Sequence, residues 1–159
     1  MHNTVDRQKS PSIQPLAALT HDERQGAEGR LDKNARILVV EDDFLVAMQM
    51  ESALTEAGFD VAGVASSGED AIELALSERP RLAVMDVRLA GDRDGIDTAL
   101  QLFAEQGIRC IFATAHHDEQ SRRRAAPAAP LGWLHKPYTM NSLVDLVRRA
   151  LDALDETER

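Results

Sequence analysis

The chain has 159 residues, a formal net charge of −9 and 43% hydrophobic residues, which is enough apolar material for one well-packed domain. The acidic balance argues against nonspecific nucleic-acid binding, which depends on an excess of Lys and Arg. There is no apolar signal core and no run near the ~20 residues of a membrane span, and the one cysteine cannot form an internal disulfide. We therefore expect a cytoplasmic protein that engages neither nucleic acid nor membrane.

The first 34 residues are rich in Pro, Gln, Ser, His and charged side chains and lack a hydrophobic period. This composition predicts a mostly disordered N-terminal leader over residues 1–34. The leader is either an arm that binds a partner or a solvated tail, and its composition favours the tail. We expect the folded domain to cover residues 35–154, followed by a short C-terminal tail at 155–159.

In the rest of the chain, short apolar runs alternate with segments of helical periodicity. The runs that predict strands are 37–40, 61–65, 82–86, 108–113 and 131–135. The segments that predict helices are 44–57, a helix capped by Ser66 or Ser67 and ended by Pro80, 95–106, 118–126, and 141–154 capped by Thr139 or Asn141. Short connections between such elements predict a doubly wound α/β fold, with a five-stranded parallel sheet and helices on both faces.

The segment between the fourth predicted helix and the fifth predicted strand is unusual. Pro127 and Pro130 should shorten or distort the helix, because proline breaks a helix interior. The same helix carries Arg122-Arg123-Arg124, which is either a docking patch for an acidic partner or a solvated helix face. The second interpretation is favoured, since charge runs usually face water.

Chemically distinctive residues stand at the ends of four predicted strands. The first strand ends in Glu41-Asp42, the third in Asp86, the fourth in Thr114 and the fifth in Lys136. Open α/β sheets bind ligands at this carboxyl edge. Clustered carboxylates repel one another, and a hard cation such as Mg²⁺ relieves the repulsion. With the lysine and the threonine, the set predicts a site that orients a phosphoryl group against a carboxylate nucleophile.

Four motifs in this order resemble the receiver domain of two-component response regulators. The motifs are Ile37-Leu38-Val39-Val40-Glu41-Asp42-Asp43, Val84-Met85-Asp86, Phe112-Ala113-Thr114-Ala115 and Lys136-Pro137. The resemblance covers about residues 35–154 and implies a flavodoxin-like (βα)5 arrangement.

The resemblance also implies a role for each matching residue. Asp86 would accept a phosphoryl group from a sensor histidine kinase, and Asp42 would ligate Mg²⁺ directly, with Glu41 acting through water. The backbone carbonyl of Arg88 would be a further ligand. Asp43 follows this pair and is expected at a helix N-terminus instead.

Three further residues acquire roles by the same resemblance. Thr114 would bond a phosphoryl oxygen, and Lys136 would pair first with the carboxylate and then with the phosphoryl group. Pro137, expected in cis, would aim Lys136. Trp133 occupies the place of the family's switching aromatic and either turns inward after phosphorylation or stays fixed in the core.

The loop after Asp86 departs from the common receiver pattern, because it lacks Met-Pro and reaches Gly95 one position late. This loop and Phe112-Ala113-Thr114 resemble a branch of stand-alone receivers with a Phe-Ala-Thr-Gly signature (the FAT GUY branch), tied to kinases of the HWE and related types. Here Ala115 replaces the glycine. We expect His116, beside the pocket, and Arg88 to tune how readily water attacks the acyl phosphate.

Together these features predict a single-domain response regulator, phosphorylated on Asp86 with Mg²⁺ as cofactor, and a monomer or weak dimer. It would act by protein–protein contact or as a phosphate sink, and not as an enzyme. One alternative is a receiver-like interaction module that is never phosphorylated. Another is a Mg²⁺-dependent phosphohydrolase, disfavoured because Arg88 stands where such enzymes usually place a second acid.

Overall fold

The computed structural model describes residues 36–115 and 118–158. The predicted leader and His116 lie outside the described residues. Five parallel strands form one sheet in the order β2-β1-β3-β4-β5. The strands are β1 (Arg36–Val40), β2 (Asp60–Ala65), β3 (Leu82–Asp86), β4 (Arg109–Thr114) and β5 (Gly132–His135).

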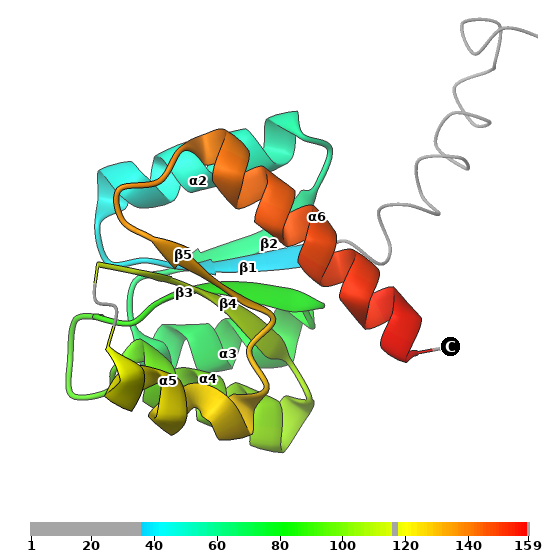
Figure 1. Cartoon of the computed structure of the whole chain (residues 1–159). Coiled ribbons are helices and arrows are strands. Elements are labelled where there is room, and N and C mark those ends of the chain that lie inside the picture. Colours follow the sequence, from blue (N-terminus) through cyan, green and yellow to red (C-terminus); the bar gives the residue numbers. More distant parts are fainter. Residues whose placement is uncertain (1–35, 116–117, 159) are drawn as a thin grey trace, which may run out of the picture. The chain divides into compact units, whose positions relative to one another are not determined.

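Helices cover both faces of this sheet, so the predicted doubly wound fold is confirmed. They are α2 (Phe44–Glu56), α3 (Gly68–Glu78), α4 (Gly95–Gln106), α5 (Glu119–Ala125), the short 3₁₀ helix η2 (Ala126–Ala128) and α6 (Met140–Thr157). Helices α2 and α6 lie on one face, and α3, α4 and α5 lie on the other (Figure 1). Helix α6 continues three residues beyond the predicted end at Leu154.

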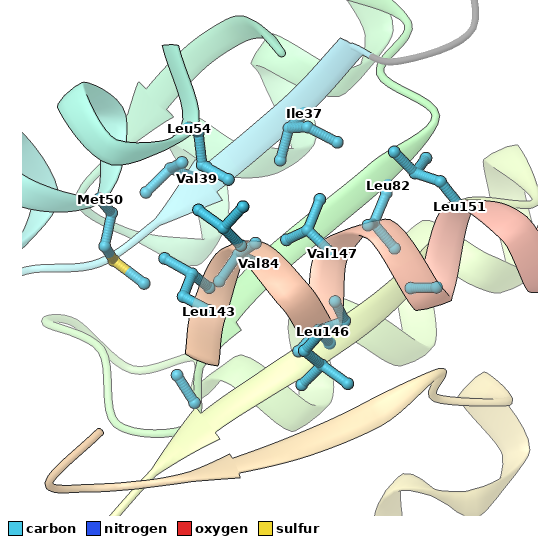
Figure 2. Packing of buried hydrophobic residues seen from close by; sticks show 14 of the residues in the cluster. Ile37, Val39, Met50, Leu54, Leu82, Val84, Leu143, Leu146, Val147 and Leu151 are labelled. Carbon is cyan, nitrogen blue, oxygen red and sulfur yellow. The ribbon is translucent and has the colours of Figure 1, made fainter. Parts of the chain in front are cut away.

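Alternating residues of each central strand build the two cores. In β1, Ile37 and Val39 pack with α2 and α6, whereas Leu38 and Val40 pack against the α3–α4 side. Figure 2 shows the first of these cores, where Val147 of α6 lies over the sheet. Each such buried aliphatic side chain contributes roughly 1.5–3 kcal/mol. A strand that is apolar on both faces is therefore held as a rigid base for the residue that follows it.

A side-chain oxygen caps the N-terminus of each described α-helix by accepting a backbone N–H. The capping residues are Asp43, Ser67, Asp94, Asp118 and Thr139. The structure thus selects Ser67 and Thr139 from the predicted pairs of candidates. Caps of this kind begin a helix directly after a strand end, which keeps loops at the carboxyl edge short.

The region after α5 is distorted as the prolines predict. Helix α5 has seven residues, and Pro127 lies within η2. Ala125 and Ala128 are buried in the core on the α4 side. The backbone carbonyl of Ala129 accepts a 2.6 Å hydrogen bond from Arg109 Nε, which ties the end of this segment to β4.

The arginine run of α5 is neither a free patch nor simply solvated. Arg124 pairs with Asp94 and Asp97, and the guanidinium carbon of Arg122 lies 5.1 Å from the centroid of the Trp133 ring. Arg123 pairs with Glu119 in the same helix, and its side chain is 77% exposed. The three arginines therefore have three different environments.

Cys110 lies inside β4 and is 1% exposed. Its burial raises the pKa of the thiol to about 12. Among the described residues, no helix is both long enough and apolar enough to span a bilayer.

Candidate functional site

The candidate site lies where the chain leaves β1 and β3 on opposite faces of the sheet. Helix α2 follows β1 on one face, and α4 follows β3 on the other, so the two connections diverge at this edge (Figure 1). Such a divergence leaves a crevice at the carboxyl ends of the strands. An open pocket of about 250 Å³ occurs here, lined by Glu41, Asp42, Asp43, Asp86, Arg88, Thr114, Ala115 and Lys136.

The turn between β1 and α2 supplies the first acidic groups. Asp43 uses its side chain to cap α2, accepting from the amides of Leu45 and Val46 at 3.0 and 3.2 Å. Its backbone amide donates to Glu41 Oε1 at 3.1 Å. Asp43 therefore starts the helix as the sequence predicts, and Glu41 and Asp42 line the pocket.

Three carboxylates converge on the pocket from two strands. Glu41, Asp42 and Asp86 each offer an oxygen, and these oxygens lie within 4.8 Å of one another. Glu41 and Asp86 are 2% and 7% exposed, whereas Asp42 is open to solvent. Two of the three negative charges are thus held out of water, which is costly without a cation.

Lys136, directly after β5, supplies a positive charge to the same place. Its Nζ lies 3.1 Å from Asp86 Oδ2 and 3.6 Å from Glu41 Oε2. The backbone amide of Lys136 donates to the carbonyl of Thr114 at 2.9 Å, which ties the two strand ends together. The Lys136–Pro137 peptide bond is cis.

Burial shifts the proton affinities of Glu41 and Lys136. Desolvation, reinforced by the charge of Asp86, raises the pKa of Glu41 to about 7 even though the amide of Asp43 acts in the other direction. Burial lowers the pKa of Lys136, but the hydrogen bond to Asp86 and the charges of Asp86 and Glu41 outweigh it and raise that pKa overall. The lysine is therefore held in its charged form.

The donor set fits Mg²⁺. Glu41 Oε2 is buried and accepts no hydrogen bond from the described residues, and the Lys136 ammonium group 3.6 Å away is shared with Asp86. Carboxylate oxygens from two strand ends are the hard ligands that Mg²⁺ prefers, usually together with several waters. Glu41, Asp42 and Asp86 are the residues that would hold the ion, and Arg88 lines the same pocket.

Comparison with known proteins agrees with this geometry. A family model described as the response regulator receiver domain matches residues 37–148. The chain belongs to the response regulator receiver family. The transcriptional regulatory protein PdtaR of Mycobacterium tuberculosis is 31% identical to this receiver over 121 residues, covering 76% of this chain and 58% of that protein.

One further curated protein and one solved structure are similar to this chain. The phyllosphere-induced regulator PhyR of Methylorubrum extorquens is 30% identical, covering 75% of this chain and 45% of PhyR. This receiver therefore spans about half the length of the curated relatives it matches. The solved signal receiver domain of a modulated diguanylate cyclase from Desulfovibrio desulfuricans G20 is 34% identical, with a TM-score of 0.70, and covers 78% of this chain and 98% of that one.

The remaining predicted site residues differ in their distance from the receiver's pocket. Thr114 lines the pocket and is 2% exposed. Trp133 does not line it: its ring stacks on Phe112 with centroids 4.6 Å apart and lies under Arg122. Trp133 is half-buried, and both interpretations of it stay predictions.

The close contact of Gly95 with Asp86 was not predicted from the sequence, in which Gly95 marks a helix start and the end of an unusual loop. A Cβ at this position would lie 1.8 Å from the backbone oxygen of Asp86, and the amide of Gly95 donates to the carbonyl of Val87 at 2.8 Å. Only glycine permits this approach. The first residue of α4 therefore contacts the backbone of the predicted acceptor, Asp86, directly. The sequence signal that could have indicated this contact is a glycine at the start of the helix that follows Asp86.

Proposed function

We propose that Asp86 accepts a phosphoryl group from a phosphohistidine of a sensor histidine kinase in a Mg²⁺-dependent phosphorelay. One observation carries the proposal. Asp86 presents a carboxylate at the pocket with Oδ2 paired to Lys136 at 3.1 Å and Oδ1 accepting the amide of Arg88 at 3.2 Å. Contacts to both oxygens fix the orientation of the carboxylate, and orienting the nucleophile is a large part of what a protein contributes to phosphoryl transfer.

In the proposed transfer, an Asp86 carboxylate oxygen attacks phosphorus. A new P–O bond forms while the P–N bond to the donor histidine breaks, and the electron pair leaves with the imidazole. The ion would neutralise charge on the phosphoryl oxygens. Lys136 would exchange its carboxylate partner for a phosphoryl oxygen, and Thr114 would bond another, since both line the pocket.

A protein donor needs a surface on which to dock, and the start of α2 offers one. Phe44, Leu45 and Met48 are 73%, 70% and 49% exposed. Met48 lies three residues from Leu45 and four from Phe44, so it neighbours both on the helix surface, and Asp43 just before them lines the pocket. Exposed apolar side chains in a group favour a protein partner. This supports a kinase domain as the donor, and the branch resemblance favours the HWE type.

The output is proposed to be protein–protein contact or withdrawal of phosphoryl groups from a shared kinase. Trp133 is the candidate to report the modification to a partner, because it lies on β5 between the pocket-lining Lys136 and the arginine-bearing α5. The charge added at Asp86 would act on Thr114, on the neighbouring strand end.

Intact-mass measurement after incubation with Mg²⁺ and acetyl phosphate, or with a purified kinase of the HWE type, tests the proposal. The wild-type protein should gain one phosphoryl group, and Asp86→Ala should gain none. Asp92→Ala is a matched control, because Asp92 is exposed and follows β3 in the same loop but does not line the pocket. Equal labelling of wild type and Asp86→Ala, or no labelling of wild type by either donor, would overturn it.

A further inference from the structure

The loop between β3 and α4, residues 87–94, contributes Arg88 to the pocket but has no regular structure beyond one isolated bridge between Ala90 and Ser67. The close contact between Gly95 and the backbone of Asp86 holds the two ends of this loop together. The amide of Arg88 then bonds Asp86 Oδ1 at 3.2 Å. The geometry of the acceptor carboxylate therefore depends on how firmly the N-terminus of α4 is held.

A side chain from another helix holds that N-terminus. Asp94 caps α4 through Oδ1, which accepts the amide of Asp97 at 2.8 Å. Its other oxygen, Oδ2, accepts Arg124 Nη2 at 2.6 Å, and the same nitrogen lies 3.0 Å from Asp97 Oδ1. One guanidinium group from α5 thus bridges the cap and the first turn of α4.

The base of Arg124 is itself fixed. The neighbouring Ala125 is fully buried, and Ala128 is 1% exposed, both packed in the core on the α4 side. Arg93, in the loop, is separately hydrogen-bonded to Gln101 of α4. Loss of the Arg124 bridge would therefore loosen the loop without releasing it.

We propose that Arg124 is a positioning residue for the phosphorylation site. Its bridge to Asp94 and Asp97 holds the start of α4, and through Gly95 it fixes the backbone of residues 86–88 that orients the Asp86 carboxylate. The consequence for phosphoryl transfer rests on the proposed function. The consequence for the order of the loop in the metal-free protein does not.

The exposure of the bridge separates this role from a stabilising one. The side chains of Arg124, Asp94 and Asp97 are 43%, 34% and 53% exposed. Ion pairs this open to solvent add little to global stability. Removal of Arg124 should therefore change the loop and the metal site while the urea midpoint stays nearly constant.

The test compares Arg124→Ala with Arg123→Ala; among the described residues, the Arg123 guanidinium group pairs with Glu119 of the same helix at a largely exposed site. Hydrogen–deuterium exchange of peptides covering residues 86–97 is measured without metal, and Mg²⁺ affinity is measured by calorimetry. In Arg124→Ala we expect faster exchange confined to these peptides and Mg²⁺ binding weaker by about three- to tenfold, at or below the usual range for groups that orient ligands. Arg124→Lys should recover part of both, and Arg123→Ala should match wild type.

Asp97→Asn weakens the other end of the bridge and should reproduce the exchange result, which keeps the test valid if Arg124→Ala folds poorly. Equal exchange and Mg²⁺ affinity in Arg124→Ala and Arg123→Ala would overturn the inference, as would faster exchange spread evenly over the whole domain. If wild type takes up no phosphoryl group, the proposed function fails, and the exchange data still decide the role of Arg124.

Discussion

The ammonium group of Lys136 lies 3.1 Å from Asp86 Oδ2, although 50 residues separate them in the chain. The pair forms because β5 and β3 both end at this edge of the sheet, on either side of β4. Since Glu41 Oε2 is only 3.6 Å from the same nitrogen, one cation serves two buried carboxylates. Loss of either side of this arrangement leaves charge uncompensated.

Replacing Lys136 by Met keeps the aliphatic stem and removes the charge. Without Mg²⁺ at pH 8, we expect a loss of about 1–2 kcal/mol in the free energy of unfolding, moderated because Lys136 is partly exposed. Added Mg²⁺ should restore more stability to the variant than to wild type, because the ion replaces the missing charge. Urea titrations with and without Mg²⁺ measure both effects, with Arg123→Met as the control. Identical midpoints for Lys136→Met and wild type would contradict the expectation.

The raised pKa of Glu41 predicts a pH dependence of stability. The unfolded side chain titrates near 4.5 and the folded one near 7, so between these values the folded state keeps a proton that the unfolded state has lost. The free energy of unfolding of the metal-free protein should therefore fall as pH rises through this window. Glu41→Gln removes the titrating carboxyl group and should abolish this fall in stability.

Urea titrations at pH 5, 6, 7 and 8 check this. Relative to wild type, the free energy of unfolding of the metal-free Glu41→Gln protein should increase as pH rises. At pH 8 it should exceed that of wild type by on the order of 2–3 kcal/mol. The difference should shrink toward pH 4.5. A constant difference between the two proteins across the series would show that Glu41 does not titrate in this range.

Gly95→Ala tests the contact between α4 and the acceptor strand. The added methyl group would lie 1.8 Å from the Asp86 carbonyl oxygen, so the backbone must move. We expect a loss of about 2–4 kcal/mol in the free energy of unfolding and a clearly weakened Mg²⁺ site. Gly58→Ala is the comparison, because Gly58 has a φ of +95° but no heavy atom within 4 Å of the added Cβ. It should cost about 1 kcal/mol and leave Mg²⁺ binding intact.

The exposed apolar group on α2 predicts a separation between donors. In a double variant, Phe44→Ser with Leu45→Ser, we expect phosphorylation by the kinase to slow at least about tenfold, since buried aromatic anchors often dominate interfaces. Uptake from acetyl phosphate should be unchanged, and so should the midpoint within about 0.5 kcal/mol, because both side chains are largely exposed. An exposed pair elsewhere, Leu76→Ser with Val64→Ser, serves as the control. Equal slowing with both donors would place the defect in the pocket instead.

Trp133 is the chain's single tryptophan, so its fluorescence can be followed directly. Its ring stacks on Phe112 and contacts the guanidinium group of Arg122. A cation–π contact of this kind contributes roughly 0.5–1 kcal/mol at an exposed site. If the indole responds to phosphorylation, its emission should change with Mg²⁺ and phosphodonor in wild type and not in Asp86→Ala. Arg122→Ala should enlarge the change. Emission that is indifferent to phosphorylation in both proteins would support the fixed-core interpretation.

Local sequence signals predicted much of this receiver. Apolar runs located all five strands to within a residue or two, because a strand buried on both faces needs consecutive aliphatic residues, and β1 and β3 supply them. Asp43 was assigned correctly to the helix start, since an aspartate preceding a helical segment has a standard capping role. The pocket residues followed from the rule that parallel strands share a carboxyl edge.

What the sequence did not predict depends on packing between distant segments. Nothing in Arg122-Arg123-Arg124 distinguishes the arginine that bridges to α4 from the one that covers Trp133. That difference arises from where α5 rests on α4 after Pro127 interrupts it. The 73% exposure of Phe44 was likewise not predicted, because an apolar residue at a helix start is normally a core candidate.

The inert thiol of Cys110 makes this chain a convenient host for chemical labels. With a thiol that is 1% exposed and a pKa near 12, the native cysteine will hardly react while the fold is intact. The rate at which a thiol reagent modifies Cys110 would therefore report the rate of global opening of the sheet. A cysteine introduced on the exposed surface of α5 would carry a probe with almost no background.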